Sequence, residues 1–176
     1  MTKVYSFILL GILAFGLNSC VLNSKFSQSS NYQEAQKVSD LHLVVIGDKD
    51  TKEAMNYVSQ FLADSLIKNK INTSKAYNCC RDKDTDMNAF ILNMLPTDHK
   101  PDNVLTVAVS KVVVGYGTTS SREFQLDLFN TASQSHTWNG RVLVNMSWFV
   151  SDQNYRDFAK TLTKAIMIEL RKKRIV

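Results

Sequence analysis

Three stretches in the second half of the chain carry strand patterns, and they constrain the fold more than any other feature. Residues 104–114 are apolar on both faces, which is typical of a central strand. Residues 124–128 alternate apolar with polar side chains, and a similar alternation runs through residues 138–148. A glycine-containing turn at 115–119 and a loop near 130–135 separate the stretches. We therefore expect a three-stranded antiparallel meander.

The first half and the end of the chain supply the other elements. An apolar run over 41–46, stopped by Gly47, predicts a buried strand, and apolar residues at helical spacing over 51–69 predict a helix. Asp50 and Glu53 resemble a capping box at its start. A weaker strand at 73–77, a short helix ending before Pro96 and a last helix from about 151 follow. The order β-α-β-α-β-β-β-α predicts an α+β two-layer sandwich, with a mixed, mostly antiparallel sheet and about three helices.

The N-terminus has the pattern of an export signal. Lys3 precedes an apolar run over 4–15, which is shorter than the ~20 residues that a membrane-spanning helix needs. The next segment, Leu17-Asn18-Ser19-Cys20, resembles the lipobox of bacterial lipoproteins. That resemblance implies a diacylglyceryl thioether on Cys20, cleavage before Cys20 and acylation of the new amine. The alternative is an uncleaved anchor or an ordinary signal peptide with an incidental cysteine.

These patterns divide the chain into three parts. Residues 1–19 are the predicted lipoprotein signal peptide, and residues 40–176 are predicted to form a single α+β domain. Residues 20–39 are polar, rich in Ser, Asn and Gln, and lack apolar periodicity, so we expect a lipidated N-terminus and flexible tether. The residue after the cysteine is Val21 rather than Asp, and this resembles the pattern of lipoproteins that are sorted to the outer membrane. The expected location is the cell envelope, lipid-anchored in the outer membrane and facing the periplasm.

The domain also resembles small envelope lipoproteins. The resemblance is carried by the strand and helix over 41–66, by Pro101-Asp102-Asn103-Val104-Leu105, by Trp138-Asn139-Gly140 and by the terminal helix over 158–176. The similar families are the lipopolysaccharide-assembly lipoprotein, the auxiliary lipoproteins of ABC transporters and the N-terminal domain of the Tol translocation protein. The resemblance to these families implies an accessory or docking role. It does not identify any functional residue in this chain.

Charge and polar residues limit the chemistry. The net charge is +5 with one dense basic run, Arg171-Lys172-Lys173-Arg174, so we expect no nucleic-acid partner. His42, His99 and His136 have no neighbours at metal-ligand or triad spacing. Asp82, Asp84 and Asp86 resemble the opening of a calcium loop. However, Met87 and Asn93 stand where such a loop needs Gly and Glu, so a turn and helix N-cap is the expectation. We expect no cofactor, no metal and no enzymatic activity.

Cys79 and Cys80 are the remaining cysteines. Adjacent Cα atoms lie ~3.8 Å apart, below the usual ~4.4–6.8 Å of a disulfide. A vicinal bond is therefore expected to be strained, and free thiols or a bond to a partner are at least as probable. The two cysteines have either a structural or incidental role, or a redox or partner-linking role.

Two further sets are candidate contacts with lipid or a partner. Trp138 and Trp148 would mark such a surface if exposed, and otherwise pack in the core or at an edge. The basic run at 171–174 either complements the dipole of the last helix or contacts acidic lipid head groups. The leading hypothesis is a non-enzymatic accessory subunit, anchored in the bilayer through acylated Cys20, that docks onto an envelope protein complex. The alternatives are a lipid- or glycolipid-binding module and a thiol-redox protein.

Overall fold

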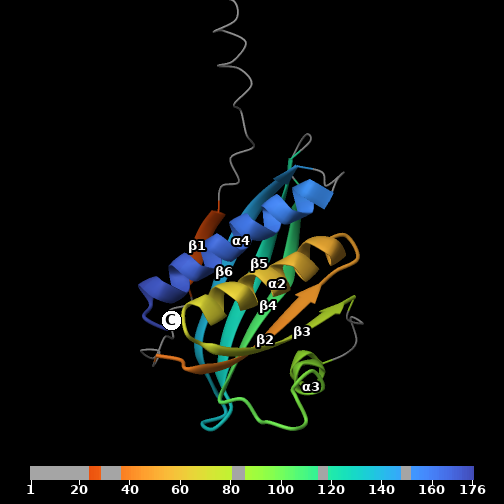
Figure 1. The fold of residues 1–176 in the computed structure, drawn as a ribbon. Helices are drawn as coiled ribbons and strands as arrows, with labels where there is room; N and C mark the ends of the chain where they lie inside the picture. Colours follow the sequence, from red (N-terminus) through yellow and green to blue (C-terminus); the bar gives the residue numbers. More distant parts are fainter. Residues whose placement is uncertain (1–23, 29–36, 81–85, 115–118, 148–151) are drawn as a thin grey trace, which may run out of the picture.

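The structure is a computed structural model that describes residues 24–28, 37–80, 86–114, 119–147 and 152–176. One sheet and three helices make up the described part (Figure 1). From β2 onwards the elements follow the predicted order, so the α+β class is confirmed. In chain order the elements are β1 (Ser24–Gln28), β2 (Asp40–Gly47), α2 (Lys52–Lys68), β3 (Asn72–Cys79), α3 (Met87–Leu92), β4 (Asn103–Val114), β5 (Thr119–Asn130), β6 (Ser135–Ser147) and α4 (Asp152–Lys172).

The sheet has six strands in the order β1-β6-β5-β4-β2-β3. Strands β4, β5 and β6 pair antiparallel, which confirms the predicted meander. Strand β2 runs parallel to both of its neighbours, β3 and β4. Parallel neighbours need crossover connections, which helices normally provide. Helix α2 crosses from β2 to β3, and the segment containing α3 leads from β3 to β4.

Strand β1 corrects the predicted tether. Within residues 20–39, the segment Ser24–Gln28 pairs antiparallel with β6, from Ser24 opposite Val144 to Gln28 opposite Gly140. Backbone hydrogen bonds to an open sheet edge require no apolar periodicity, which explains why the polar composition did not reveal a strand. The folded part of the chain therefore begins well before residue 40.

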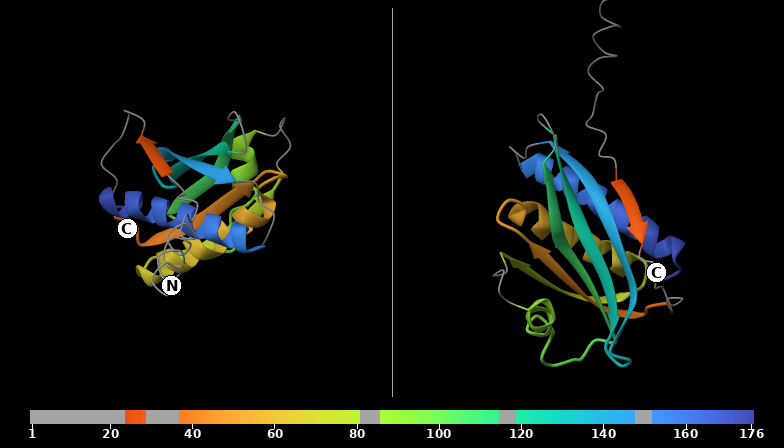
Figure 2. Two further views of the ribbon diagram at one scale, coloured as in Figure 1. Left: turned by 90° about the horizontal axis from the view of Figure 1, so that it is seen from above. Right: turned by 180° about the vertical axis from the view of Figure 1, so that it is seen from behind.

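The main core lies between one face of the sheet and helices α2 and α4, which lie side by side over it (Figures 1 and 2). The rings of Phe124 on β5 and Phe158 on α4 pack with centroids 5.6 Å apart. Trp138 on β6 is 1% exposed in this core. The predicted apolar faces of the two long helices are therefore the faces that pack on the sheet.

The opposite face of the sheet carries a smaller, partial layer. Helix α3 and the residues after it cover β2 and β4 there, and Val44 and Val104 pack against Phe90 and Leu95. The predicted two-layer sandwich did not include this partial layer on the second face of the sheet. The layer is six residues of helix plus an irregular segment, so it covers only part of the face.

The helix starts differ in how well they were predicted. The N-cap of α2 is Thr51, and the backbone N–H groups of Asp50 and Thr51 donate to Asp48 Oδ1, at 3.1 and 2.7 Å. The predicted Asp50–Glu53 capping box is therefore wrong, because the N-cap is Thr51, whose side chain makes no capping hydrogen bond, and Asp50 lies in the turn that Asp48 holds. Asp86 caps α3 by accepting from the Ala89 N–H at 2.9 Å, as predicted. Asp82 and Asp84 lie outside the described residues.

Candidate binding pocket

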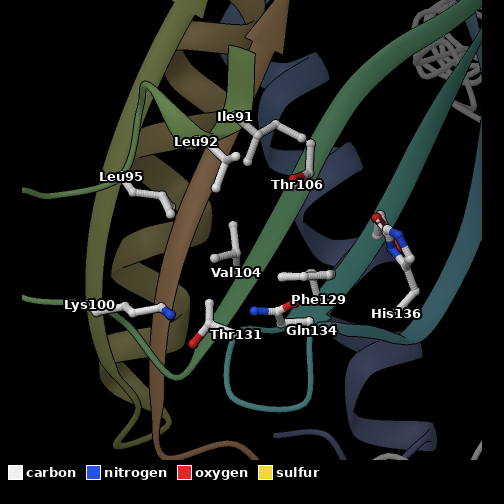
Figure 3. Close-up of a pocket in the computed structure, with 11 residues that line it drawn as sticks. Ile91, Leu92, Leu95, Lys100, Val104, Thr106, Phe129, Thr131, Gln134 and His136 are labelled. Atoms are coloured by element: carbon white, nitrogen blue, oxygen red, sulfur yellow. Dashed lines mark hydrogen bonds and ion pairs between the residues drawn. The ribbon is translucent and has the colours of Figure 1, made fainter. Parts of the chain in front are cut away.

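A pocket of about 470 Å³ lies on the α3 face of the sheet (Figure 3). We call it the α3 pocket. Helix α3, strands β4, β5 and β6 and two loops contribute to it, so residues far apart in sequence meet there. Its lining residues are Ile91, Leu92, Leu95, Lys100, Val104, Thr106, Asp127, Phe129, Thr131, Gln134 and His136.

Apolar side chains form two of its walls. Ile91, Leu92 and Leu95 come from α3 and the turn after it, and Val104 and Phe129 come from the sheet (Figure 3). Leu92 is 63% exposed, which is unusual for a leucine in a packed layer. The pocket exists because α3 covers β2 and β4 and ends before β5, which leaves Phe129 only partly covered.

Polar groups line the remaining side. His136 Nδ1 lies 2.7 Å from Asp127 Oδ2, and the imidazole packs edge-on against the Phe129 ring at 5.3 Å. Burial raises the pKa of Asp127, while the facing His136 acts in the opposite direction. The Thr131 hydroxyl donates to the Pro101 carbonyl at 2.6 Å and joins the two loops of the pocket. Lys100 adds an exposed cation, so the rim presents both signs of charge.

His42 fastens the α3 layer to the sheet. Its side chain lies between Met94 O, 3.0 Å from Nε2, and Ser74 Oγ, 2.7 Å from Nδ1. A carbonyl can only accept, so Nε2 carries the proton and the neutral ring accepts from Ser74 at Nδ1. His42 is 3% exposed, and burial lowers its pKa, against the opposing effects of the Met94 hydrogen bond and Asp40. This predicted residue is therefore structural support for the pocket wall.

The other histidine and the cysteine pair lie elsewhere. His99 is exposed, 3.3 Å from Asp40 at the start of β2. Cys79 and Cys80 form a disulfide at the end of β3. From the Cα spacing, we expected free thiols or a bond to a partner at least as much as a vicinal disulfide. The structure has the vicinal disulfide. The Cys80 N–H donates to the Gly47 carbonyl at 3.0 Å, which ties this end of β3 to β2.

The predicted contact residues are separated in the structure. Trp138 is buried in the core because its strand position faces α4, so its side chain cannot form a contact surface. Trp148 and the lipidation residue Cys20 lie outside the described residues. The basic run sits at the end of α4, where Arg171 donates to Asn69 Oδ1 at 3.2 Å and Lys172 lies 3.9 Å from Glu169. Lys173 and Arg174 follow the helix.

A buried ion pair was missed at the sequence level. Arg122 on β5 is 8% exposed, with Nη1 2.5 Å from Asp48 Oδ2 and Nη2 3.0 Å from Asp50 Oδ2. Arg122 lies on the same strand face as the buried Phe124 and Leu126, because side chains two residues apart point to the same side. A charged residue at a core-facing position of the strand could therefore have indicated the ion pair. The pair joins β5 to the loop between β2 and α2, close to the disulfide.

No group of three or more His, Cys, Asp or Glu side chains that could hold a metal ion occurs among the residues that the structure describes. Across the same residues, no helix combines the length and apolar character needed to cross a membrane.

Comparison with known proteins gives remote structural similarity alone. No family model and no curated protein matches the sequence. Among solved structures, the PelC dodecamer from Paraburkholderia phytofirmans has 14% identity and a TM-score of 0.48, over 80% of this chain and 96% of that one. Lipoprotein GNA1162 from Neisseria meningitidis has 12% identity and a TM-score of 0.44, over 76% and 99%. Protein XCC0632 from Xanthomonas campestris, of family DUF330, has 7% identity and a TM-score of 0.45, over 81% and 90%. Similarity at this level is too remote to carry a function to this chain.

Proposed function

We propose that the protein is a lipid-anchored accessory protein of the cell envelope that docks onto a partner protein through the α3 pocket. The observation that carries the proposal is the pocket itself, which combines apolar walls with a few placed polar groups. Pockets of a few hundred Å³ with this composition are the usual form of a binding site. The exposed side chain of Leu92 stands at its edge, available for contact.

The anchor rests on the lipobox and on the position of β1. Ser24, the first residue of β1, follows Cys20 by four residues, and four residues span at most roughly 14 Å. A lipid on Cys20 therefore holds the sheet close to the bilayer. A domain held in this way meets membrane proteins in preference to soluble ones, which is the geometry expected of an accessory subunit.

The rim of the pocket favours a protein partner. Lys100 supplies a cation, Asp127 supplies a carboxylate paired with His136, and Gln134 can both donate and accept. A polypeptide segment with an apolar side chain and backbone amides can use all of these groups. An acyl chain needs only apolar walls, so it would make no use of the Lys100 cation or the Gln134 amide.

Photo-crosslinking in cells tests the proposal. A photoreactive amino acid in place of Leu92 should give one prominent protein adduct in membranes, while the same residue at exposed Gln153 on α4 should not. Recovery of the protein without any adduct at Leu92, under conditions where the Gln153 variant is equally abundant, would overturn docking through the pocket. Fatty-acid labelling that disappears in a Cys20→Ala variant tests the anchor separately.

A second candidate function is a lipid- or glycolipid-binding module. The observation that favours it is the pair of apolar walls, with Ile91 and Leu95 on the α3 side and Phe129 on the sheet side. It predicts that lipid co-purifies with the protein. Native mass spectrometry of the protein released gently from membranes should then show a bound mass, which the docking proposal does not require.

A further inference from the structure

The helix face opposite the α3 pocket carries a basic groove. The groove runs between α2 and α4, measures about 430 Å³, and is lined by four cationic residues and no acidic one. We call it the α2–α4 groove. Its lining residues are Phe61, Ser65, Lys68, Asn69, Lys160, Thr163, Lys164, Met167, Ile168 and Arg171. The two helices lie side by side on the outer side of the molecule (Figures 1 and 2).

The cations are available to an external anion. Lys68 and Lys164 are exposed, and Lys160 lies 3.3 Å from Asp157 on the same helix. Exposed pairs of this kind contribute little and exchange readily. Arg171 donates to an amide oxygen of Asn69, which fixes the guanidinium without neutralising it. Asp64 is the nearby exposed carboxylate on α2, so the surface keeps a net positive charge.

Apolar side chains accompany the charges. Ile168 is 50% exposed in the groove, between the positions of Lys164 and Arg171, and Met167 and Phe61 form its floor. Cations around one exposed apolar side chain are compatible with a membrane surface, where the charges contact head groups and the apolar group reaches the acyl boundary.

The anchor position brings this surface to the membrane. Strand β1 lies at the sheet edge beside β6, and α4 contacts it. With Cys20 at most roughly 14 Å from Ser24, the helix layer is within reach of the bilayer to which Cys20 is attached.

We propose that the α2–α4 groove docks onto anionic phospholipid head groups of the bilayer that holds the lipid anchor, an inference that rests on the anchor of the proposed function. The lipid supplies attachment, and the groove supplies orientation. Because α3 lies on the other face of the sheet, the α3 pocket then points away from the membrane.

Lysine footprinting of the lipidated protein tests this orientation. The protein is reconstituted into vesicles of phosphatidylcholine, with or without phosphatidylglycerol, and lysines are acylated and counted by mass spectrometry. We expect Lys68, Lys160 and Lys164 to be labelled several-fold more slowly with phosphatidylglycerol present, and Lys100 on the pocket face to be unchanged. High salt should remove the protection, since it screens exposed charges. Equal labelling in both vesicles, or protection of Lys100 instead, would overturn the proposal.

Matched variants separate the groove from the anchor. Each removed charge lowers the equilibrium constant for contact with an anionic surface roughly fivefold, so Lys68→Gln with Lys164→Gln should lower the docking equilibrium constant by about 25-fold and expose Lys160. Lys100→Gln removes the same charge on the other face and should leave the protection of Lys160 intact. Loss of protection in both variants would refute the assignment. If the anchor itself is wrong, the protein fails to float with pure phosphatidylcholine vesicles, which is a distinct result.

Discussion

Replacing Asp48 by alanine should destabilise the fold more than any neighbouring acidic substitution. Asp48 accepts from the Thr51 N–H and hydroxyl, each at 2.7 Å, from the Asp50 N–H and from Arg122. Without Asp48, Arg122 keeps its ion pair with Asp50 but loses the one with Asp48. Arg122 is 8% exposed, and its Nε already has no hydrogen-bond partner among the described residues. Breaking one side of a buried pair costs about 3–5 kcal/mol. The Asp48 side chain is 37% exposed, so we discount this to about 2–3 kcal/mol.

Thermal and urea unfolding followed by circular dichroism measure this cost. At this chain length, 1 kcal/mol corresponds to about 2–4 °C in Tm, so Asp48→Ala should lower the Tm by about 4–12 °C. The control is Asp50→Ala, whose 74% exposed side chain predicts a loss of at most about 1 kcal/mol. Adding Arg122→Met to Asp48→Ala removes the uncompensated charge and should restore part of the loss. Equal effects of Asp48→Ala and Asp50→Ala, or a double variant less stable than Asp48→Ala, would refute the reasoning.

Three further predictions concern the pocket support, the disulfide and β1. Burial lowers the pKa of His42, so the unfolded chain binds a proton near pH 6.5 before the fold does. The free energy of unfolding should therefore fall as the pH drops below about 6.5, and less so in His42→Gln; parallel urea curves with the same pH slope would contradict this. Thiol titration of the denatured protein should find Cys79 and Cys80 only after reduction, and free thiols beforehand would show that the disulfide is absent. Proline at both Lys25 and Phe26 should accelerate amide exchange in β6 and leave β4 unchanged; unchanged exchange in β6 would argue against β1.

The elements found from the sequence are those that bury side chains. Strands β5 and β6 leave a period of two in the apolar residues and helix α2 a period of 3.6, because one face of each must enter the core. Strands β2 and β4 leave continuous apolar runs instead, because both of their faces are covered. Strand β1 leaves no such mark, since its pairing with β6 depends on backbone groups. The Thr51 N-cap of α2 was also missed, because Asp48 forms a turn with Asp50 and Thr51 directly before the helix, which a spacing rule cannot locate.

The candidate site depended on strand register, which the sequence did not specify. Asp127 and His136 lie on adjacent strands and meet because Phe129 pairs with His136 across the sheet. A shift of one residue would place these side chains on the opposite face. For Trp138, the sequence predicted the alternation of faces but not which face is buried. Only the packing of α4 shows that the face of Trp138 is the buried one.

The pairing of β1 with β6 changes how the proposed lipid anchor would act. A flexible link as long as residues 20–39 would let the domain turn freely above the bilayer, so neither face of the sheet would have a fixed direction. With Ser24 already in the sheet, only Val21, Leu22 and Asn23 separate the domain from Cys20. A link this short limits both height and tilt. The sheet then separates two surfaces of different character, a basic helix face and a pocket face with apolar walls. Because these surfaces lie on opposite sides of one rigid sheet, orienting the first toward anionic lipid also determines the direction in which the second can receive a partner.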